Sequence, residues 1–191
     1  MIAIRKNYIK SSDKGGEVRR LTHSPFAWPH FIYIFLLLFL LPAGYSASAA
    51  DEENAESLPV PRFASFKSGE VNMRVGPGTR YSINWVYKHE GLPVEIIQEF
   101  DQWREVRDFE GTTGWVHKQM LQGKRTAVVK GGVSVLRRSP EAHANPLLRL
   151  ESGVMGRLLE CEKDWCRIQV SSHKGWIEKN HLWGVYPKEE F

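Results

Sequence analysis

The feature that most constrains this chain of 191 residues is a pattern that occurs twice in its C-terminal part. Trp103 and Trp165 lie 62 positions apart, and the dipeptides Gly114–Trp115 and Gly175–Trp176 are offset by 61. Each copy contains an apolar run, a polar turn, a tryptophan that opens an alternating run, a second turn, and Gly-Trp. A period of this length corresponds to a small domain, since solenoid repeats of 20 to 50 residues must stack on neighbours. The sequence therefore predicts two similar small domains in tandem.

Residues 1–50 have the pattern of a secretory signal peptide. Six Lys and Arg residues precede an unbroken apolar run from Phe31 to Leu41, and the small residues Ala47–Ala50 follow. A charged leader, a short apolar segment and a small-residue cleavage site are typical of export signals. The alternative is a membrane anchor, but the apolar run is shorter than the ~20 residues that a spanning helix needs. We expect an exported, periplasmic protein that meets the membrane only through this peptide during export.

The positive charge of the chain belongs to this leader. The whole chain has a formal net charge of +4. Residues 1–50 hold six basic and two acidic residues, hence +4, and residues 51–191 hold 20 of each sign, hence 0. Nucleic-acid-binding domains present a basic patch or stripe. The balanced charge therefore argues against a nucleic-acid partner.

The remaining chain divides by composition. Residues 51–62 are acidic, contain proline and lack aromatic residues, which predicts a flexible linker. The first domain is expected over 63–122 and the second over 127–184, and the tail over 185–191 is expected to be frayed.

Short β-rich runs with turn residues between them predict an all-β fold. Residues 118–121 and 179–182 each fit a single helical or 3₁₀ turn before a last short strand. Five or six short strands in about sixty residues favour a small, partly open barrel in each copy. The expected strands are Val71–Val75, Pro93–Phe100, Trp103–Arg107, Gly114–His117, Val133–Arg137, Val154–Cys161, Trp165–Val170 and Gly175–Glu178.

These motifs together resemble the bacterial SH3 domain. The first copy carries Asn72–Arg74, Gly76–Gly78, Gly91–Val94, Trp103 and Gly111–Trp115, and the second copy is similar but looser. The likeness covers about residues 63–187 and is greatest to exported tandem-SH3 proteins. It implies two SH3-like β-barrels after a cleaved signal peptide. Within this family some domains bind cell-wall peptides and others flank hydrolase domains.

The two cysteines are predicted to form a disulfide. Asp101–Gln102 and Lys163–Asp164 are two-residue turns, which set the register of the hairpins around them. Phe100 then faces Trp103, and the next pair is Glu99 with Arg104. In the second copy that next pair is Cys161 with Cys166, at a non-hydrogen-bonded position where Cα atoms lie close together. This spacing suits a disulfide, and an exported protein meets oxidising conditions.

No catalytic or metal-binding constellation is recognisable. A zinc site would need four closely spaced ligands, and the seven histidines are scattered. Cys161 corresponds to Glu99 and Cys166 to Arg104, so the two copies share no nucleophile. We therefore expect neither enzymatic activity nor a cofactor.

The aromatic residues divide into two groups. Tyr81, Trp85 and Tyr87 crowd one segment of the first copy, and the equivalent segment of the second, residues 141–150, has none. This asymmetry predicts a ligand platform to which Arg74 adds polar contacts; the alternative is packing against the neighbouring domain or its last strand. The repeated tryptophans are interpreted as structural lids of the barrels: Trp103, Trp115, Trp165 and Trp176.

These expectations favour a non-catalytic binding module. The partner is expected to be a peptide, peptidoglycan or an envelope protein, bound by SH3-like barrels in the cell envelope. The alternative is a structural or protein-interaction module that docks an envelope enzyme and binds no small ligand.

Overall fold

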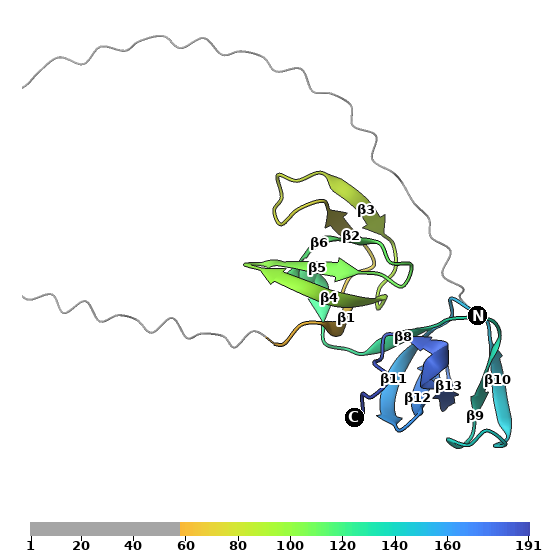
Figure 1. Cartoon of the computed structure of the whole chain (residues 1–191). Coiled ribbons are helices and arrows are strands. Elements are labelled where there is room, and N and C mark those ends of the chain that lie inside the picture. Colours follow the sequence, from red (N-terminus) through yellow and green to blue (C-terminus); the bar gives the residue numbers. More distant parts are fainter. Residues whose placement is uncertain (1–57) are drawn as a thin grey trace, which may run out of the picture. The chain divides into compact units, whose positions relative to one another are not determined.

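The computed structural model describes residues 58–191. The predicted signal peptide and most of the predicted linker lie outside these residues. The described chain forms two seven-stranded antiparallel sheets, one for each sequence repeat, which confirms the predicted all-β class (Figure 1). None of the helices within 58–191 has the length and apolar character needed to cross a bilayer.

Barrel 1 is the sheet with strand order β3-β2-β6-β5-β4-β1-β7. A 3₁₀ turn, η1 (Lys118–Met120), precedes the last strand. That strand pairs with β1, so the first and last strands of the barrel lie side by side. The strands are β1 (Arg62–Phe66), β2 (Val71–Arg74), β3 (Ile83–Tyr87), β4 (Pro93–Phe100), β5 (Trp103–Arg107), β6 (Thr113–His117) and β7 (Leu121–Gln122).

Barrel 2 repeats this arrangement in the order β10-β9-β13-β12-β11-β8-β14. Its 3₁₀ turn is η2 (Lys179–His181). The strands are β8 (Thr126–Val129), β9 (Ser134–Arg137), β10 (Pro146–Leu150), β11 (Met155–Glu162), β12 (Trp165–Val170), β13 (His173–Glu178) and β14 (Leu182–Trp183).

All eight expected strands are present, with ends shifted by a few residues at most. The structure adds strands that the sequence pattern had left unassigned, β1, β3, β8 and β10. The fully buried strand β8 shows why it was missed: it has no polar face, so a period of two is absent from its sequence.

Each barrel has its own apolar core. The core of barrel 1 is built around Phe66, Met73 and Val94, and that of barrel 2 around Leu136, Leu150 and Ile168. All six side chains are completely or almost completely buried. Two such small cores explain why the chain needs further links within and between the barrels.

The glycine before each repeated tryptophan is required by the close approach of two strands. A Cβ atom at Gly114 would lie 2.9 Å from the carbonyl oxygen of Arg74, and one at Gly175 would lie 2.7 Å from that of Arg137. The glycines therefore let β6 pair with β2, and β13 pair with β9, at close backbone distance.

The predicted hairpin register is confirmed in both barrels. Phe100 pairs with Trp103 and Glu99 with Arg104, whose Nε lies 3.0 Å from Glu99 Oε1. In barrel 2, Cys161 pairs with Cys166 and the two form a disulfide, with Cα atoms 4.1 Å apart. One hairpin is thus clamped by an ion pair and the other by a covalent bond.

Reducing this disulfide should lower the free energy of unfolding by about 2 kcal/mol, because the bond closes a loop of only six residues. The fold should persist, since both barrels keep their cores. Urea unfolding with and without reductant measures the difference.

The control for reductant effects is the double variant Cys161→Ala and Cys166→Ala, in which reductant should change nothing. Equal stability of the oxidised and fully reduced protein, with both thiols shown by labelling to be free, would contradict a stabilising role for the bond.

Candidate functional site

The aromatic residues predicted to form a platform in barrel 1 differ in burial and in what they pack against. Tyr81 packs on the turn at Gly76, where an added Cβ would lie 2.6 Å from the Tyr81 ring. Trp85 is partly buried and packs against the core. Tyr87 is only 7% exposed, its ring centroid lies 5.0 Å from that of Phe66, and its hydroxyl donates to Asp108 Oδ2. Tyr87 thus belongs to the core of barrel 1, whereas Tyr81 and Trp85 are half-buried.

Arg74 is occupied by the long loop that follows it. Its Nη1 donates to the carbonyl oxygens of Thr79 at 3.1 Å and Tyr81 at 2.7 Å. Arg137, at the equivalent place in barrel 2, donates in the same way to the carbonyl of Ala144. The arginine therefore holds the loop in place in both barrels.

The repeated tryptophans lie on the outer faces of the sheets. In β12 the buried residues are Cys166, Ile168 and Val170, so the alternation of the strand turns Trp165 to the opposite face. Trp176 in β13 alternates in the same way with the buried Ile177. All four repeated tryptophans are half-buried, so part of each ring remains accessible: Trp103, Trp115, Trp165 and Trp176.

A hollow of about 740 Å³ lies beside one of these rings, Trp165. We call it the Trp165 groove. Its walls come from the loop between β9 and β10, the turn between β11 and β12, and η2. The ring of Trp165 and the apolar side chains of Pro140 and Leu182 line the groove beside charged groups. The charged side chains that line the groove are Lys130, Glu141, Asp164, Glu178 and Lys179.

The groove has the chemistry of a binding site for an extended polar ligand. A half-buried tryptophan offers a flat apolar face, and the surrounding side chains offer hydrogen-bond and ionic partners. No group of three or more His, Cys, Asp or Glu residues suited to a metal ion is present within residues 58–191.

The C-terminal tail forms part of the groove and is not frayed as expected. The backbone N–H and C=O of Phe191 both bond to Cys161, at 3.1 and 2.9 Å, as in a short added strand. Val185 and Pro187 line the groove. The backbone polar groups of β11 attract the tail because unpaired strand edges readily accept another segment.

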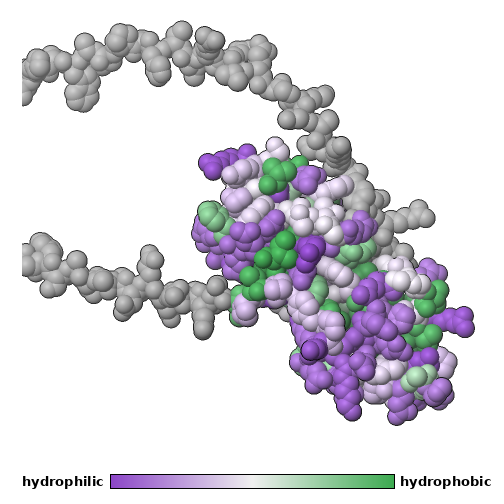
Figure 2. Space-filling model, in the orientation of Figure 1, coloured by the Kyte–Doolittle hydropathy of each residue, from purple (hydrophilic) through white to green (hydrophobic). Residues whose placement is uncertain are grey.

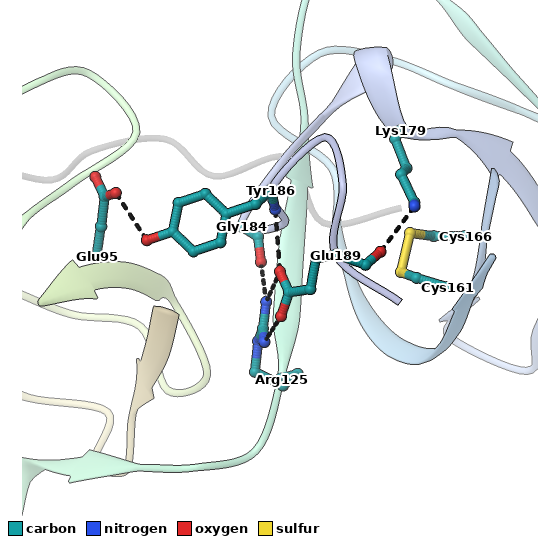
Figure 3. A network of polar contacts seen from close by, with 8 residues as sticks. All are labelled: Glu95, Arg125, Cys161, Cys166, Lys179, Gly184, Tyr186 and Glu189. Carbon is teal, nitrogen blue, oxygen red and sulfur yellow. Dashed lines mark hydrogen bonds and ion pairs between the residues drawn. A yellow bond between two sulfur atoms is a disulfide. The ribbon is translucent and has the colours of Figure 1, made fainter. Parts of the chain in front are cut away.

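A polar network ties this tail to both barrels (Figure 3). Arg125 pairs with the Glu189 carboxylate and donates to the carbonyl of Gly184 at 2.7 Å. Lys179 Nζ donates to the Glu189 carbonyl oxygen at 2.7 Å. The hydroxyl of Tyr186 donates to Glu95 Oε1 of barrel 1 at 2.9 Å.

Aromatic rings pack beside this network. The ring of Phe63 in barrel 1 meets that of Trp183 edge to face at a centroid distance of 5.1 Å, and that of Tyr186 at 4.7 Å. Thr126 Oγ1 also donates to the carbonyl of Gly91 at 2.7 Å. The two barrels are therefore joined by specific side-chain contacts as well as by the chain.

The network shifts the pKa of two of its members. Burial and the hydrogen bond to Glu95 raise the pKa of Tyr186, so its hydroxyl stays protonated as a donor. Burial would raise the pKa of Glu189, but hydrogen bonds from Arg125 and the Tyr186 backbone, with the charges of Arg125 and Lys179, outweigh it and lower that pKa below 4.5.

Glu189→Gln should lower the free energy of unfolding at neutral pH by about 1 to 2 kcal/mol, because it removes charged hydrogen bonds. A lowered folded-state pKa contributes stability at pH values above 4.5 that is lost as the pH falls through the folded value. The variant should therefore have a flatter decline of stability in acid. Denaturant unfolding between pH 2 and pH 7 measures both effects.

Glu190→Gln is the matched control, since among residues 58–191 this exposed neighbour accepts only from the backbone N–H of Lys163. It should leave the acid decline as in the unmodified protein. Identical pH profiles for Glu189→Gln and the unmodified protein would show that the network contributes nothing.

Polar side chains cover most of the face shown in Figure 2, and hydrophobic residues gather there in smaller patches. The large hydrophobic residues with the most exposed side chains within the barrels lie at loops and hairpin ends: Val75 at 60%, Phe100 at 59% and Val133 at 62%.

Comparison with protein families gives the identity of both barrels. The model of the bacterial SH3 domain matches residues 67–123 and again residues 130–184. The chain belongs to the bacterial SH3 domain family and carries two copies of its domain. Domains of this family are binding modules. A comparison with curated proteins gave no match.

The chain is also similar, at low sequence identity, to solved structures of NlpC proteins and of an NlpC/P60 family protein. The chain is similar to NlpC2 from Trichomonas vaginalis, with 14% identity over 70% of this chain and 51% of that one, at a TM-score of 0.32. NlpC1 from the same organism matches at 14% identity over 67% and 47%, with a TM-score of 0.31. An NlpC/P60 family protein from Bacillus cereus matches at 14% identity over 63% and 55%, with a TM-score of 0.28. The chain thus spans about half the length of these structures.

The groove residues are missed in the sequence because Trp165 is interpreted there as a structural lid of its barrel. A signal for the correct face was present. Cys166, Ile168 and Val170 form one alternating apolar set, which leaves Trp165 on the other face of β12. The turn and the tail that complete the groove come from separate parts of the chain and carry no such signal.

Proposed function

We propose that the protein is a non-catalytic binding module of the cell envelope, and that the Trp165 groove binds an extended ligand from peptidoglycan. The observation that carries this proposal is the hollow of about 740 Å³ beside a half-buried tryptophan. Such a ring is a platform for the flat faces of peptide bonds and sugars, and a concave site excludes water from the contact.

Three carboxylates of barrel 1 are engaged in structural pairs. Glu99 is shared by Arg62 and Arg104. Glu95 accepts from Arg107 and Tyr186. Asp108 accepts from the hydroxyl of Tyr87 and from two backbone N–H groups of the following loop. These acids hold barrel 1 together and, through Tyr186, join it to barrel 2, so their role in barrel 1 is structural.

Two features support the envelope as the place of action. Both barrels belong to the bacterial SH3 domain family, whose members occur in cell-envelope proteins. The Cys161–Cys166 disulfide suits an oxidising compartment. Peptidoglycan supplies both sugar rings and extended peptides there, the two kinds of surface that an exposed indole accommodates.

Trp165→Ala should weaken retention of the purified protein on isolated peptidoglycan by roughly thirty-fold, since losing a central aromatic anchor costs about 2 kcal/mol. Co-sedimentation over a range of peptidoglycan concentrations measures the change. A thermal melt of the same sample checks that the fold is retained.

Trp176→Ala is the matched control, because Trp176 is also half-buried on the outer sheet face but does not line the groove. Its binding should remain close to that of the unmodified protein. Absence of retention of the unmodified protein, or equal losses in both variants, would overturn the proposed function.

The second candidate is a module that docks an envelope protein. Phe100 favours it: this side chain is 59% exposed at the end of β4, next to Trp103, whose ring lies 5.4 Å from that of His117. Exposed aromatic side chains are enriched at protein interfaces. Retention of an envelope protein that Phe100→Ser abolishes and Trp165→Ala does not would favour this candidate.

A further inference from the structure

The two barrels place the same tryptophan beside different partners. Trp103 pairs across the sheet with His117, and Trp165 pairs with Glu178. The turn residue just before the tryptophan also differs, being Gln102 in barrel 1 and Asp164 in barrel 2. The equivalent positions around the two rings therefore carry no acid in barrel 1 and two acids in barrel 2.

The long loop adds to this difference. Residues 75–82 of barrel 1 contain Arg80 and no acidic residue, whereas residues 138–145 of barrel 2 supply Glu141 to the wall of the Trp165 groove. Three carboxylates thus line the groove: Glu141, Asp164 and Glu178.

The carboxylates of the groove are open to a ligand. Within residues 58–191 the side chains of Asp164 and Glu141 have no hydrogen-bond or ion-pair partner, and both residues are exposed. Glu178 Oε2 accepts from Asn180 Nδ2 at 3.2 Å and lies 3.9 Å from His181 Nε2.

The cations that line the groove only partly offset these charges. Lys179 is 7% exposed, and its ammonium group donates to the Glu189 carbonyl on the side of the tail. Lys130 is exposed at the wall. Three carboxylates beside an aromatic face, with one of the two ammonium groups held by the tail, leave an environment complementary to positive charge.

We propose that the Trp165 groove selects an extended peptide that carries a primary ammonium group, and that the equivalent face of barrel 1 does not. The proposal deepens, and rests on, the proposed function of this groove. An ammonium group has three donors and no acceptor, so it suits several carboxylates at once. It is also attracted to the face of an indole ring.

The test compares two peptides of one sequence, acetyl-Ala-Lys-Ala-amide and the same peptide with an acetylated lysine side chain. Binding is followed through the indole N–H signal of Trp165 in nitrogen-15 spectra of the purified protein. The signal is assigned with Trp165→Phe. The peptide with the free amine should bind roughly tenfold more tightly than the acetylated one, and its binding should weaken as salt is added.

The informative variant is Asp164→Gln together with Glu178→His, which gives barrel 2 the residues of barrel 1. This double variant should lose the preference for the free amine, although it retains the ring of Trp165. The matched control is Asp101→Asn together with Glu105→Gln, which also removes two negative charges, but from barrel 1. This variant should bind both peptides as the unmodified protein does.

Equal binding of both peptides, no change at Trp165 with either, or equal losses in the two double variants would overturn the proposal. Retention on peptidoglycan that depends on Trp165 but not on the free amine would remove the amine preference and leave the proposed function standing. Binding of the amine peptide without retention on peptidoglycan would remove the proposed function and leave the amine preference of the groove standing.

Discussion

Two short turns, Asp101–Gln102 and Lys163–Asp164, determine on which face of its sheet each following side chain lies. Because side chains alternate along a strand, a slip of one residue would exchange the inner and outer faces of β5 or β12. The observed register puts the Cys161–Cys166 disulfide inside barrel 2 and Trp165 outside. The buried disulfide and the half-buried ring on the outer face both follow from this register.

The two barrels have the same strand arrangement but differ in their contacts and surfaces. Barrel 1 closes its hairpin with an ion pair and joins barrel 2 through Phe63 and Glu95. Barrel 2 carries the tail, which pairs with β11, buries Lys179 and completes the Trp165 groove. The corresponding Lys118 of barrel 1 is exposed, since no tail covers it. Duplication thus supplied two similar scaffolds, and a few unmatched residues distinguish their surfaces.

The fold was largely predictable because its signals are local. Alternation and turn residues gave the eight expected strands, and hairpin geometry gave the Cys161–Cys166 pair. The candidate site was less predictable. Tyr87 and Trp85 looked like an exposed cluster in the sequence, but β3 turns one into the core and packs the other against it. Composition of a segment does not say which face its side chains occupy when the strand itself is unassigned.

The sequence by itself determined the repeat, the all-β class, the register of both hairpins and the disulfide, because each depends on residues close together along the chain. Only the tertiary structure decided that the tail docks on β11, that Arg125 joins it through Glu189, and that Trp165 borders a groove. These features bring together segments tens of residues apart. Their contacts depend on how the strands pack in three dimensions, and a pattern of neighbouring residues in the sequence does not predict that packing.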